Sequence, residues 1–264
     1  MNSPKRLLIR QQIQDQFDRA ANTYDSVSEL QRRMGQSLQQ LIVESGSNPE
    51  DSLIDLGCGT GELLLGLEQA GLSNLTGLDL SAQMLEVAKT KTSSASFVHA
   101  DIESIPCDDG AFKLAVSNAA LQWCDIGMAA KEIFRTLEPG GKAWLTSFTE
   151  GTLGQWHRAF TTLGFKSRVH VLPGATEIRC QFEQAGFKVV NVELLAETVR
   201  FDSVENMFGS IKRLGASNAM ESRSRMNRAE YQATKQLFQN ELETQGQLGL
   251  DYVWVQMSVE KPLT

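Results

Sequence analysis

The chain has 264 residues, of which 41% are hydrophobic, and this suits one α/β domain with insertions. Its formal net charge of −7 argues against general nucleic-acid binding, because such binding requires a basic face. The four cysteines form no C-x-x-C pair and no segment reaches the roughly 18 apolar residues of a membrane span, so we expect reduced thiols, a cytoplasmic location and no membrane partner.

Two helices are predicted before the first strand. Residues 4–21 carry apolar side chains spaced for one helical face, and residues 29–42 form the second helix. The two helices could simply pack against a sheet, or they could cover a ligand that binds there. In either case residues 1–50 are expected to be a helical cap.

A glycine-rich stretch follows the cap, with the sequence S-L-I-D-L-G-C-G-T-G at residues 52–61. The apolar pair before Asp55 is typical of a buried parallel strand, and the three alternate glycines let the backbone turn sharply and approach a ligand closely. A helix then continues to about Ala70, so its free N–H groups point at whatever lies over the loop. Alone, the pattern indicates only a glycine turn. With the Asp55 carboxylate beside it, it also suits a ligand that carries a cationic amine and a flat ring.

Two further predicted strands end in acidic residues. Residues 75–80 form a strand that contains Asp79, with Ser81 placed to cap the next helix, and residues 96–100 lead into Asp101. Because the carboxyl ends of parallel strands meet at one edge of the sheet, these carboxylates should gather where ligands of such folds bind. The sequence therefore predicts a nucleoside-cofactor site at this edge.

The fourth predicted strand, residues 112–117, should lie beside the first strand in a doubly wound sheet. Its carboxyl end then faces the reactive part of the ligand, so Asn118, Gln122 and Trp123 are candidates to line that space. A place in the core would suit Trp123 equally well. The next predicted elements are a helix at residues 127–137, a strand at 142–148, an amphipathic stretch at 151–168, a helix at 176–185 and a strand at 188–195.

The late part of the chain interrupts the sheet and then completes it. We expect helical insertions at about residues 150–172 and 202–246, and these would form a substrate cover. The alternating sequence of residues 250–262, L-D-Y-V-W-V-Q-M-S-V-E-K-P, predicts an antiparallel strand that closes the sheet edge. The predicted fold is thus α/β, a doubly wound, mostly parallel seven-stranded sheet whose last strand is antiparallel.

A local excess of basic residues marks residues 209–228, where five basic side chains stand against one acid, Glu221. The excess indicates a solvated helix face, a docking patch for an anionic partner, or an anchor for a substrate carboxylate. An arginine can bind a carboxylate through two parallel charge-assisted hydrogen bonds, which a lysine cannot reproduce. The basic residues are Lys212, Arg213, Arg223, Arg225 and Arg228.

The motifs of the first half resemble the class I S-adenosylmethionine-dependent methyltransferases; they read D-L-G-C-G-T-G, L-D-L-S, A-D-I-E-S-I-P and L-E-P-G-G. The resemblance implies that S-adenosylmethionine is the cofactor and that the glycine loop holds its methionine part. It also implies that Asp79 binds both ribose hydroxyls and that Asp101 and Ile102 bracket the adenine. The implied cofactor-binding residues are Tyr24, Gln31, Asp55, Gly57, Cys58, Gly59, Gly61, Asp79, Leu80, Met84, Asp101, Ile102 and Asn118.

Motifs along nearly the whole chain resemble one subgroup, the malonyl-acyl carrier protein O-methyltransferases of biotin synthesis. They read F-D-R-A-A-N-T-Y-D, S-N-A-A-L-Q-W-C and I-K-R-L-G-A-S-N, followed by the closing strand. The chain departs from the subgroup at Gly154-Gln155, where a Glu is usual, and at Asp251, where L-T-Y is usual. The resemblance implies methyl transfer to the free carboxylate of a malonyl thioester, with an acyl carrier protein as partner, by a methyltransferase domain of residues 51–264.

The same resemblance implies where the substrate binds. Arg213 is the first choice to hold the substrate carboxylate because it lies in the subgroup's own motif, with Lys212, Arg158 and Arg135 as alternatives and Trp123 beside the pocket. No general base is expected, since a carboxylate is already a nucleophile and catalysis can depend on alignment. The three histidines form no pair, and we expect no metal site.

Three other functions stay open on the sequence alone. A methyltransferase for a small carboxylic acid or a quinone precursor would share this core, because fold does not fix substrate. A nicotinamide-dependent dehydrogenase would share the strand-glycine-helix start, although the third glycine of the G-x-G-x-x-G spacing is missing. A cofactor-binding partner subunit without catalytic activity is the third. The sequence also leaves open whether the malonyl group is carried by the carrier protein or by coenzyme A.

Overall fold

Seven strands form one sheet in the computed structural model, which describes residues 4–167, 169, 171–213 and 226–263. The strand order is β3-β2-β1-β4-β5-β7-β6, and neighbouring strands are parallel except where β7 is involved. The predicted α/β fold with a mostly parallel sheet is therefore confirmed. The strands are β1 (Leu53–Leu56), β2 (Leu75–Asp79), β3 (Ser96–His99), β4 (Phe112–Asn118), β5 (Leu137–Phe148), β6 (Lys188–Phe201) and β7 (Leu248–Glu260).

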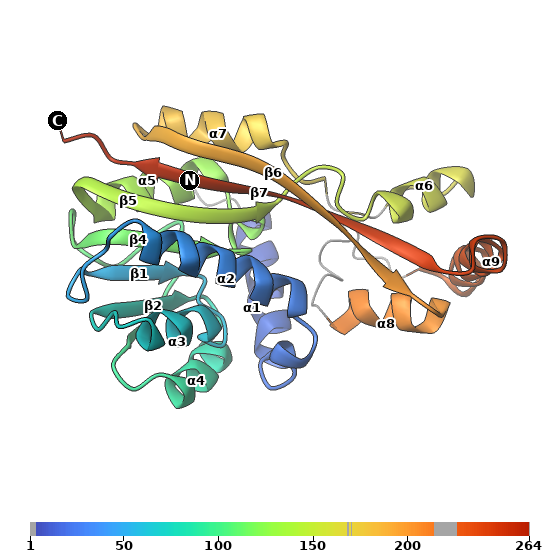
Figure 1. The fold of residues 1–264 in the computed structure, drawn as a ribbon. Helices are drawn as coiled ribbons and strands as arrows, with labels where there is room; N and C mark the ends of the chain where they lie inside the picture. Colours follow the sequence, from blue (N-terminus) through green and yellow to red (C-terminus); the bar gives the residue numbers. More distant parts are fainter. Residues whose placement is uncertain (1–3, 168, 170, 214–225, 264) are drawn as a thin grey trace.

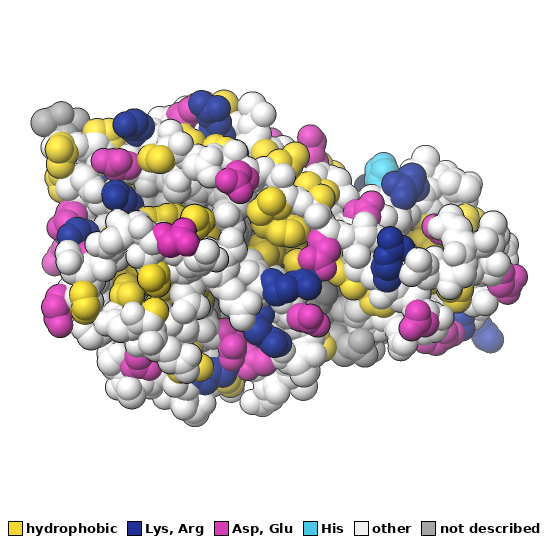
Figure 2. Space-filling view, viewed as in Figure 1, with side chains coloured by type: hydrophobic (Ala, Val, Ile, Leu, Met, Phe, Trp, Pro, Cys, Tyr) yellow, Lys and Arg dark blue, Asp and Glu magenta, His cyan; other side chains and the backbone are white. Residues whose placement is uncertain are grey.

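The position of β7 corrects one prediction. The strand is antiparallel as expected, but it lies between β5 and β6 and does not close the sheet edge. Trp254 and Val255 point to opposite faces and are both buried, as in a strand that is covered on both sides. β6 is the edge strand instead, with Val190 and Leu194 more than half exposed. Hydrophobic side chains gather on the surface where β6 and β7 leave the core (Figure 2).

Helices cover both faces of the core sheet (Figure 1). Leu38, Leu64 and Leu85 come from three different helices and meet in one apolar core, while Ile133 and Phe182 belong to the core on the other face. The helices and short 3-10 turns are α1 (Pro4–Ala20), η1 (Tyr24–Ser26), α2 (Glu29–Glu44), α3 (Glu62–Gln69), α4 (Ala82–Lys91), η2 (Leu121–Trp123), α5 (Ile126–Thr136), α6 (Gly154–Thr162), α7 (Ala175–Gln184), α8 (Val204–Arg213) and α9 (Arg228–Gln245).

A lobe projects from the core where the outer halves of β6 and β7 continue beyond the other strands (Figure 1). The predicted insertions supply its helices α6, α8 and α9, and its apolar core includes the buried side chains of Trp156, Phe160 and Phe238. The same apolar cluster contains Leu30 of α2 and Ala119, the residue after β4. The lobe therefore packs against the carboxyl edge of the core sheet, where the sequence places a ligand.

Local signals set several of the element boundaries. Ser81 caps α4 as predicted, because its hydroxyl accepts a hydrogen bond of 3.1 Å from the Met84 N–H. β5 begins at Leu137 and not at the expected Lys142, since the chain pairs with Phe112 before a register shift in this pair of strands. Among the described residues, no helix has the length and apolar character needed to cross a membrane.

Candidate functional site

The loop after β1 has a backbone that only glycine adopts easily. Gly57, Gly59 and Gly61 have φ angles of 78°, 52° and 79°, all in the left-handed region. A Cβ at Gly57 would lie 2.4 Å from the Ala120 Cβ, whereas a Cβ at Gly59 would meet nothing within 4 Å. The loop thus packs tightly below Gly57 and leaves open space beside Gly59.

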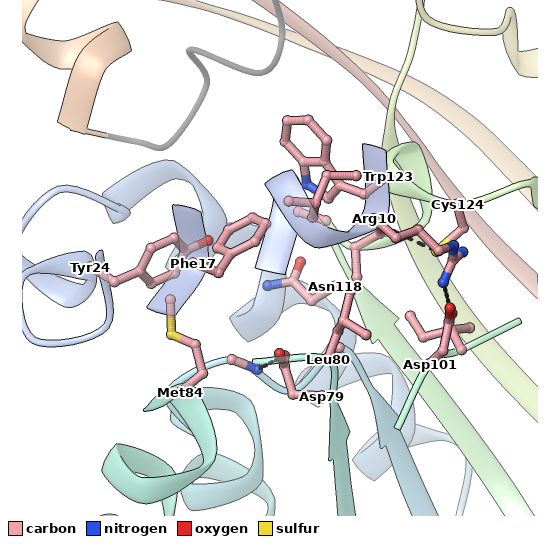
Figure 3. A pocket seen from close by; sticks show the side chains of 16 residues that line it. Arg10, Phe17, Tyr24, Asp79, Leu80, Met84, Asp101, Asn118, Trp123 and Cys124 are labelled. Carbon is pink, nitrogen blue, oxygen red and sulfur yellow. Dashed lines mark hydrogen bonds and ion pairs between the residues drawn. The ribbon is translucent and has the colours of Figure 1, made fainter. Parts of the chain in front are cut away.

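A cavity of about 690 Å³ lies over this loop at the carboxyl edge of the sheet (Figure 3). Residues from the cap, the glycine loop and the ends of β2, β3 and β4 line it together. Six of them were not among the expected site residues: Arg10, Ile13, Phe17, Ala119, Ala120 and Cys124. Those that the sequence predicted are Tyr24, Gly57, Gly59, Asp79, Leu80, Met84, Asp101, Ile102, Asn118 and Trp123.

A second cavity of about 470 Å³ adjoins the first and shares Tyr24, Gly57, Gly59 and Asn118 with it. Its lining adds three further predicted residues, which are Gln31, Asp55 and Cys58. Gly61 lines neither cavity; it stands at the start of α3, where a Cβ would meet the Ala88 Cβ at 2.9 Å.

Asp79 is fixed by the backbone around it. Its two oxygens accept hydrogen bonds of 2.8 Å each from the N–H groups of Gly59 and Ser81. Burial raises the pKa of Asp79, and these two hydrogen bonds oppose the rise. The carboxylate is consequently held in one orientation beside the first cavity (Figure 3).

Asp55 differs from Asp79 because one of its carboxyl oxygens is not held by any group of the described residues. It is buried, and its Oδ1 has no hydrogen-bond partner among the described residues. Burial, followed by the nearby charge of Asp79, raises the pKa of Asp55 to about 8. The Oε1 atoms of Gln31 and Gln122 are likewise buried without a donor among the described residues. Such unpaired acceptors suit a cationic, donor-rich ligand.

Helix α1 brings an arginine to Asp101 (Figure 3). Arg10 forms ion pairs with Asp101 and Glu103, and Arg6 pairs with Glu103 and Asp125. Arg10 and Phe17 were not among the site residues expected from the sequence. The available signal was the stripe of Arg6, Arg10, Ile13 and Phe17 on one face of α1, but the partner of that face cannot be read from the helix itself.

The turn η1 is tied to the glycine loop through Asp25. Its carboxylate accepts a hydrogen bond of 2.6 Å from the Thr60 hydroxyl and lies 2.6 Å from the Lys91 ammonium, which also pairs with Glu62 at 2.5 Å. These contacts hold Tyr24 over the loop, and burial raises the pKa of its phenol.

An aromatic row and an arginine complete the cap side of the site. The Phe17 ring lies 6.3 Å from Tyr24 and 5.9 Å from Trp123, each at a steep angle (Figure 3). Arg32 lines the second cavity and donates a hydrogen bond of 2.9 Å to the carbonyl of Asp25. Sequence reasoning named its neighbour Gln31 and missed Arg32, although both lie in the same L-Q-R motif.

Asn118 joins three elements at the end of β4. Its amide N–H donates to the Gln31 carbonyl of α2 at 2.8 Å, and its Oδ1 accepts from the Thr146 hydroxyl of β5 at 2.8 Å. The next residue, Ala119, has a φ of 51°, an uncommon conformation for a residue with a side chain. Gln122 donates to the Ala119 carbonyl and lines neither cavity.

The structure separates the substrate-binding candidates. Lys212 and Arg213 belong to the last turn of α8, and their side chains lie outside the described residues, as does most of the basic stretch 209–228. Arg158 is exposed on α6 and lines neither cavity. Arg135 pairs with Glu132 and Asp109 and is engaged elsewhere. On the surface shown in Figure 2, basic and acidic side chains are interspersed.

The comparisons with known proteins agree with this geometry. A family model described as a methyltransferase domain matches residues 54–145. The chain is 38% identical over 165 residues to a malonyl-[acyl-carrier protein] O-methyltransferase of Pseudescherichia vulneris, a match that covers 62% of this chain and 63% of that protein. It is 32% identical over 216 residues to the protein of the same name from a Marinomonas species, covering 80% of this chain and 79% of the relative.

A solved structure shares the fold over almost the full length. It is the methyltransferase in the complex with the Haloferax volcanii Trm112 methyltransferase activator, with a TM-score of 0.64 and 18% identity, covering 95% of this chain and 97% of that one. At 18% identity, this similarity supports the fold and carries no information on the substrate.

Proposed function

Because this chain belongs to the malonyl-[acyl-carrier protein] O-methyltransferase family, we propose that it transfers the methyl group of S-adenosylmethionine to the free carboxylate of malonyl-acyl carrier protein. The product, a malonyl methyl ester, would start the pimeloyl chain of biotin. The supporting observation is that Asp55, Asp79 and Asp101 come from the ends of three neighbouring strands and surround adjoining cavities. The Asp55 Oδ1 beside the second cavity has no hydrogen-bond partner among the described residues.

The second cavity fits the amino-acid end of the cofactor. S-adenosylmethionine carries an ammonium, a carboxylate and a sulfonium at this end. The unpaired oxygen of Asp55 would accept from the ammonium, and Arg32 would pair with the carboxylate. The Oε1 of Gln31 is a further acceptor for this positively charged end.

The first cavity fits the nucleoside end. Asp79, already oriented by two backbone N–H groups, would bind the ribose hydroxyls. Ile102 and Met84 provide apolar surface for the adenine, and Asp101 would accept from its amine. The proposed cap, residues 1–50, would cover the cofactor, because Phe17 of α1 lies beside this cavity, which opens in the proposed methyltransferase domain of residues 51–264.

The chain has to align its reactants and does not need to activate them. The bound cofactor supplies a methyl group on a positively charged sulfur, and the substrate supplies a carboxylate that is already a nucleophile. Asn118, which is anchored to both α2 and β5, would provide a fixed wall at the reacting end. The row of Phe17, Tyr24 and Trp123 would limit access of water. No residue is assigned as a general base.

Basic residues are proposed to bind the methyl acceptor, malonyl-acyl carrier protein. Arg213 is proposed to hold the malonyl carboxylate, because it lies in a motif characteristic of the family, with Lys212 as the neighbouring alternative. The basic residues from Arg223 to Arg228 are proposed to meet the acidic surface of the carrier protein, so this docking should weaken as salt increases.

The test is a methyl-transfer assay with isotopically labelled cofactor. The protein is incubated with malonyl-acyl carrier protein, malonyl-coenzyme A or a small dicarboxylic acid, and the products are analysed by mass spectrometry for a methyl ester. Labelled ester on the malonyl thioester, with preference for the carrier protein, is expected. Transfer to the small acid alone would contradict the proposal.

Two arginine variants separate the proposed anchor from general charge effects. Arg213→Ala should abolish turnover or raise KM for the malonyl substrate while cofactor affinity stays unchanged. Arg158→Ala removes an exposed arginine from α6 and serves as the matched control, with activity close to that of the wild type. Equal activity in the two variants would remove the assignment of Arg213.

A further inference from the structure

Paired residues of β4, β5 and β7 form rows across the face that α2 covers. Asn118 pairs with Thr146, and Thr146 pairs with Gln256, so the three side chains share one face. Two hydrogen bonds to α2 mark that face: Asn118 donates to the Gln31 carbonyl, and the Ser37 hydroxyl donates to Gln256 at 2.9 Å. This row therefore runs from the end of β4 into β7.

The next row toward the carboxyl edge contains Phe148, Trp254 and Leu195. β4 has ended by this point, so the row begins beside the space that follows Asn118. Adjacent strands are about 4.8 Å apart and a step of two residues is about 7 Å, so the Trp254 backbone lies on the order of 12 Å from that of Asn118. The Trp254 side chain belongs to the same apolar cluster as Ala119, which also lines the first cavity.

Trp254 carries an unused hydrogen-bond donor. Its side chain is among the buried residues, with 9% of its surface exposed, and its indole Nε1 has no partner among the described residues. Buried donors in folded proteins are nearly always paired with protein, water or a bound ligand, so the indole N–H of Trp254 is available to an acceptor that enters the site. Its neighbour on the same face, Tyr252, is 6% exposed and packs on Phe148 with ring centroids 5.9 Å apart.

The unpaired polar atoms divide by type between the two sides of the site. On the cofactor side, Asp55 and Gln31 leave acceptor oxygens without donors among the described residues. On the lobe side, the indole donors of Trp254 and Trp156 find no acceptor in the described part of the chain. A cationic cofactor suits the first group. An oxygen-bearing acyl group suits the second, because an indole N–H can only donate and a thioester carbonyl oxygen can accept from it.

We propose that the indole N–H of Trp254 binds the thioester carbonyl oxygen of the methyl acceptor and so positions its far carboxylate toward the methyl group. The inference rests on the proposed function, since it takes a malonyl thioester as the acceptor. Trp254 is a substrate-positioning residue of β7, and the apolar walls formed by Phe148 and Tyr252 keep water from its N–H.

The first test follows the indole N–H signals by NMR in protein labelled with ¹⁵N-tryptophan. The chain has 4 tryptophans, so each signal can be assigned from a Trp→Phe variant. S-adenosylhomocysteine alone should shift the Trp123 signal, because Trp123 lines the cofactor cavity. Later addition of malonyl-acyl carrier protein, or of malonyl-pantetheine without the carrier, should shift Trp254 downfield. Trp144, buried in another apolar cluster, should respond little to either addition.

The second test compares Trp254→Phe with Trp144→Phe, which makes the same substitution two rows further from the carboxyl edge of the same sheet. Trp254→Phe keeps an aromatic ring but removes the donor, and Trp144→Phe controls for the lost volume. KM for the malonyl thioester should therefore rise about tenfold in Trp254→Phe while the Kd of S-adenosylhomocysteine stays unchanged. Trp144→Phe should change neither value by more than about twofold.

The possible outcomes separate the inference from the proposed function. Suppose that the wild type methylates the malonyl thioester, but the Trp254 indole signal does not shift and Trp254→Phe has the same KM as Trp144→Phe. The inference is then wrong and the proposed function stands. If the wild type methylates no malonyl thioester, the proposed function is wrong. The thioester carbonyl can then no longer be the group that the Trp254 N–H binds.

Discussion

Replacement of Asp55 by Asn should make the protein more stable and at the same time weaken its binding of cofactor. Burial raises the pKa of Asp55 from its usual 3.8 to about 8. The unfolded chain releases this proton near pH 4 and the folded chain releases it near pH 8, so folded-state stability falls as pH rises between these values and is level above them. The neutral amide of Asn avoids this cost.

The shift sets the size of the effect. A change from 3.8 to about 8 corresponds to at most about 6 kcal/mol at 1.36 kcal/mol per pKa unit. Because the amide also leaves polar atoms unpaired, we expect a gain of about 2–4 kcal/mol at pH 9 and almost none below pH 4. The measurement is urea unfolding of the ligand-free protein at both pH values.

Cofactor binding gives a second measurement on the same side chain. At pH 7 a carboxyl group with a pKa of about 8 is about nine-tenths protonated, so capture of an ammonium should release close to one proton. Calorimetry of S-adenosylhomocysteine binding in buffers of different ionisation enthalpy measures this release, which Asp55→Asn should abolish while it lowers the affinity.

Asp51→Asn is the matched control. Asp51 lies just before β1, at the end opposite to Asp55, and its carboxylate pairs with Lys113 at 2.8 Å. This hydrogen bond is the main cause that lowers the pKa of Asp51. That variant should gain no stability at pH 9 and should bind cofactor normally. The reasoning would be refuted if Asp55→Asn were no more stable than the wild type at pH 9. It would also be refuted if the variant released as many protons as the wild type when it binds S-adenosylhomocysteine.

Two further predictions concern the cap and the glycine loop. Arg10→Ala should lower the free energy of unfolding by about 1–3 kcal/mol, because it leaves the Glu103 carboxylate, 5% exposed, with one charged partner fewer; a melting temperature equal to that of the wild type would contradict this. Gly57→Ala should destabilise more than Gly46→Ala. Both glycines have φ near 75°, but a Cβ at Gly57 meets another side chain at 2.4 Å and one at Gly46 meets nothing within 4 Å. We expect about 1 kcal/mol for Gly46→Ala and more than about 2 kcal/mol for Gly57→Ala by urea unfolding, and equal losses would show that the loop relaxes.

The parts of the site that were predictable are those encoded by short local patterns. The glycine loop with its acid, the acid that ends β2 and the acid that follows β3 all lie at strand ends. Strand ends can be located from apolar runs and turn residues. Parallel pairing then brings Asp79 and Asp101 to one cavity without further information. The cap helices were predicted as well, because their apolar spacing is a local property.

The missed parts depend on contacts between distant segments. Arg10 and Asp101 are 91 positions apart, and nothing in either segment specifies the other. The alternation in β7 predicts a strand and suits an antiparallel one, but its place between β5 and β6 follows from pairing on both sides. Arg135 is similar: it was considered for a substrate carboxylate, yet the chain folds so that Glu132 and Asp109 take up its charge.

The central place of β7 has a consequence for how the chain folds during synthesis. β7 leaves the ribosome after β5 and β6, the two strands that it separates, so neither has its neighbour on that side while the earlier part of the chain is already made. Until β7 arrives, two strands with unpaired backbone groups face each other across a gap, and such edges invite pairing with other chains. Interrupted translation that omits β7 should therefore yield aggregates and not a smaller working enzyme.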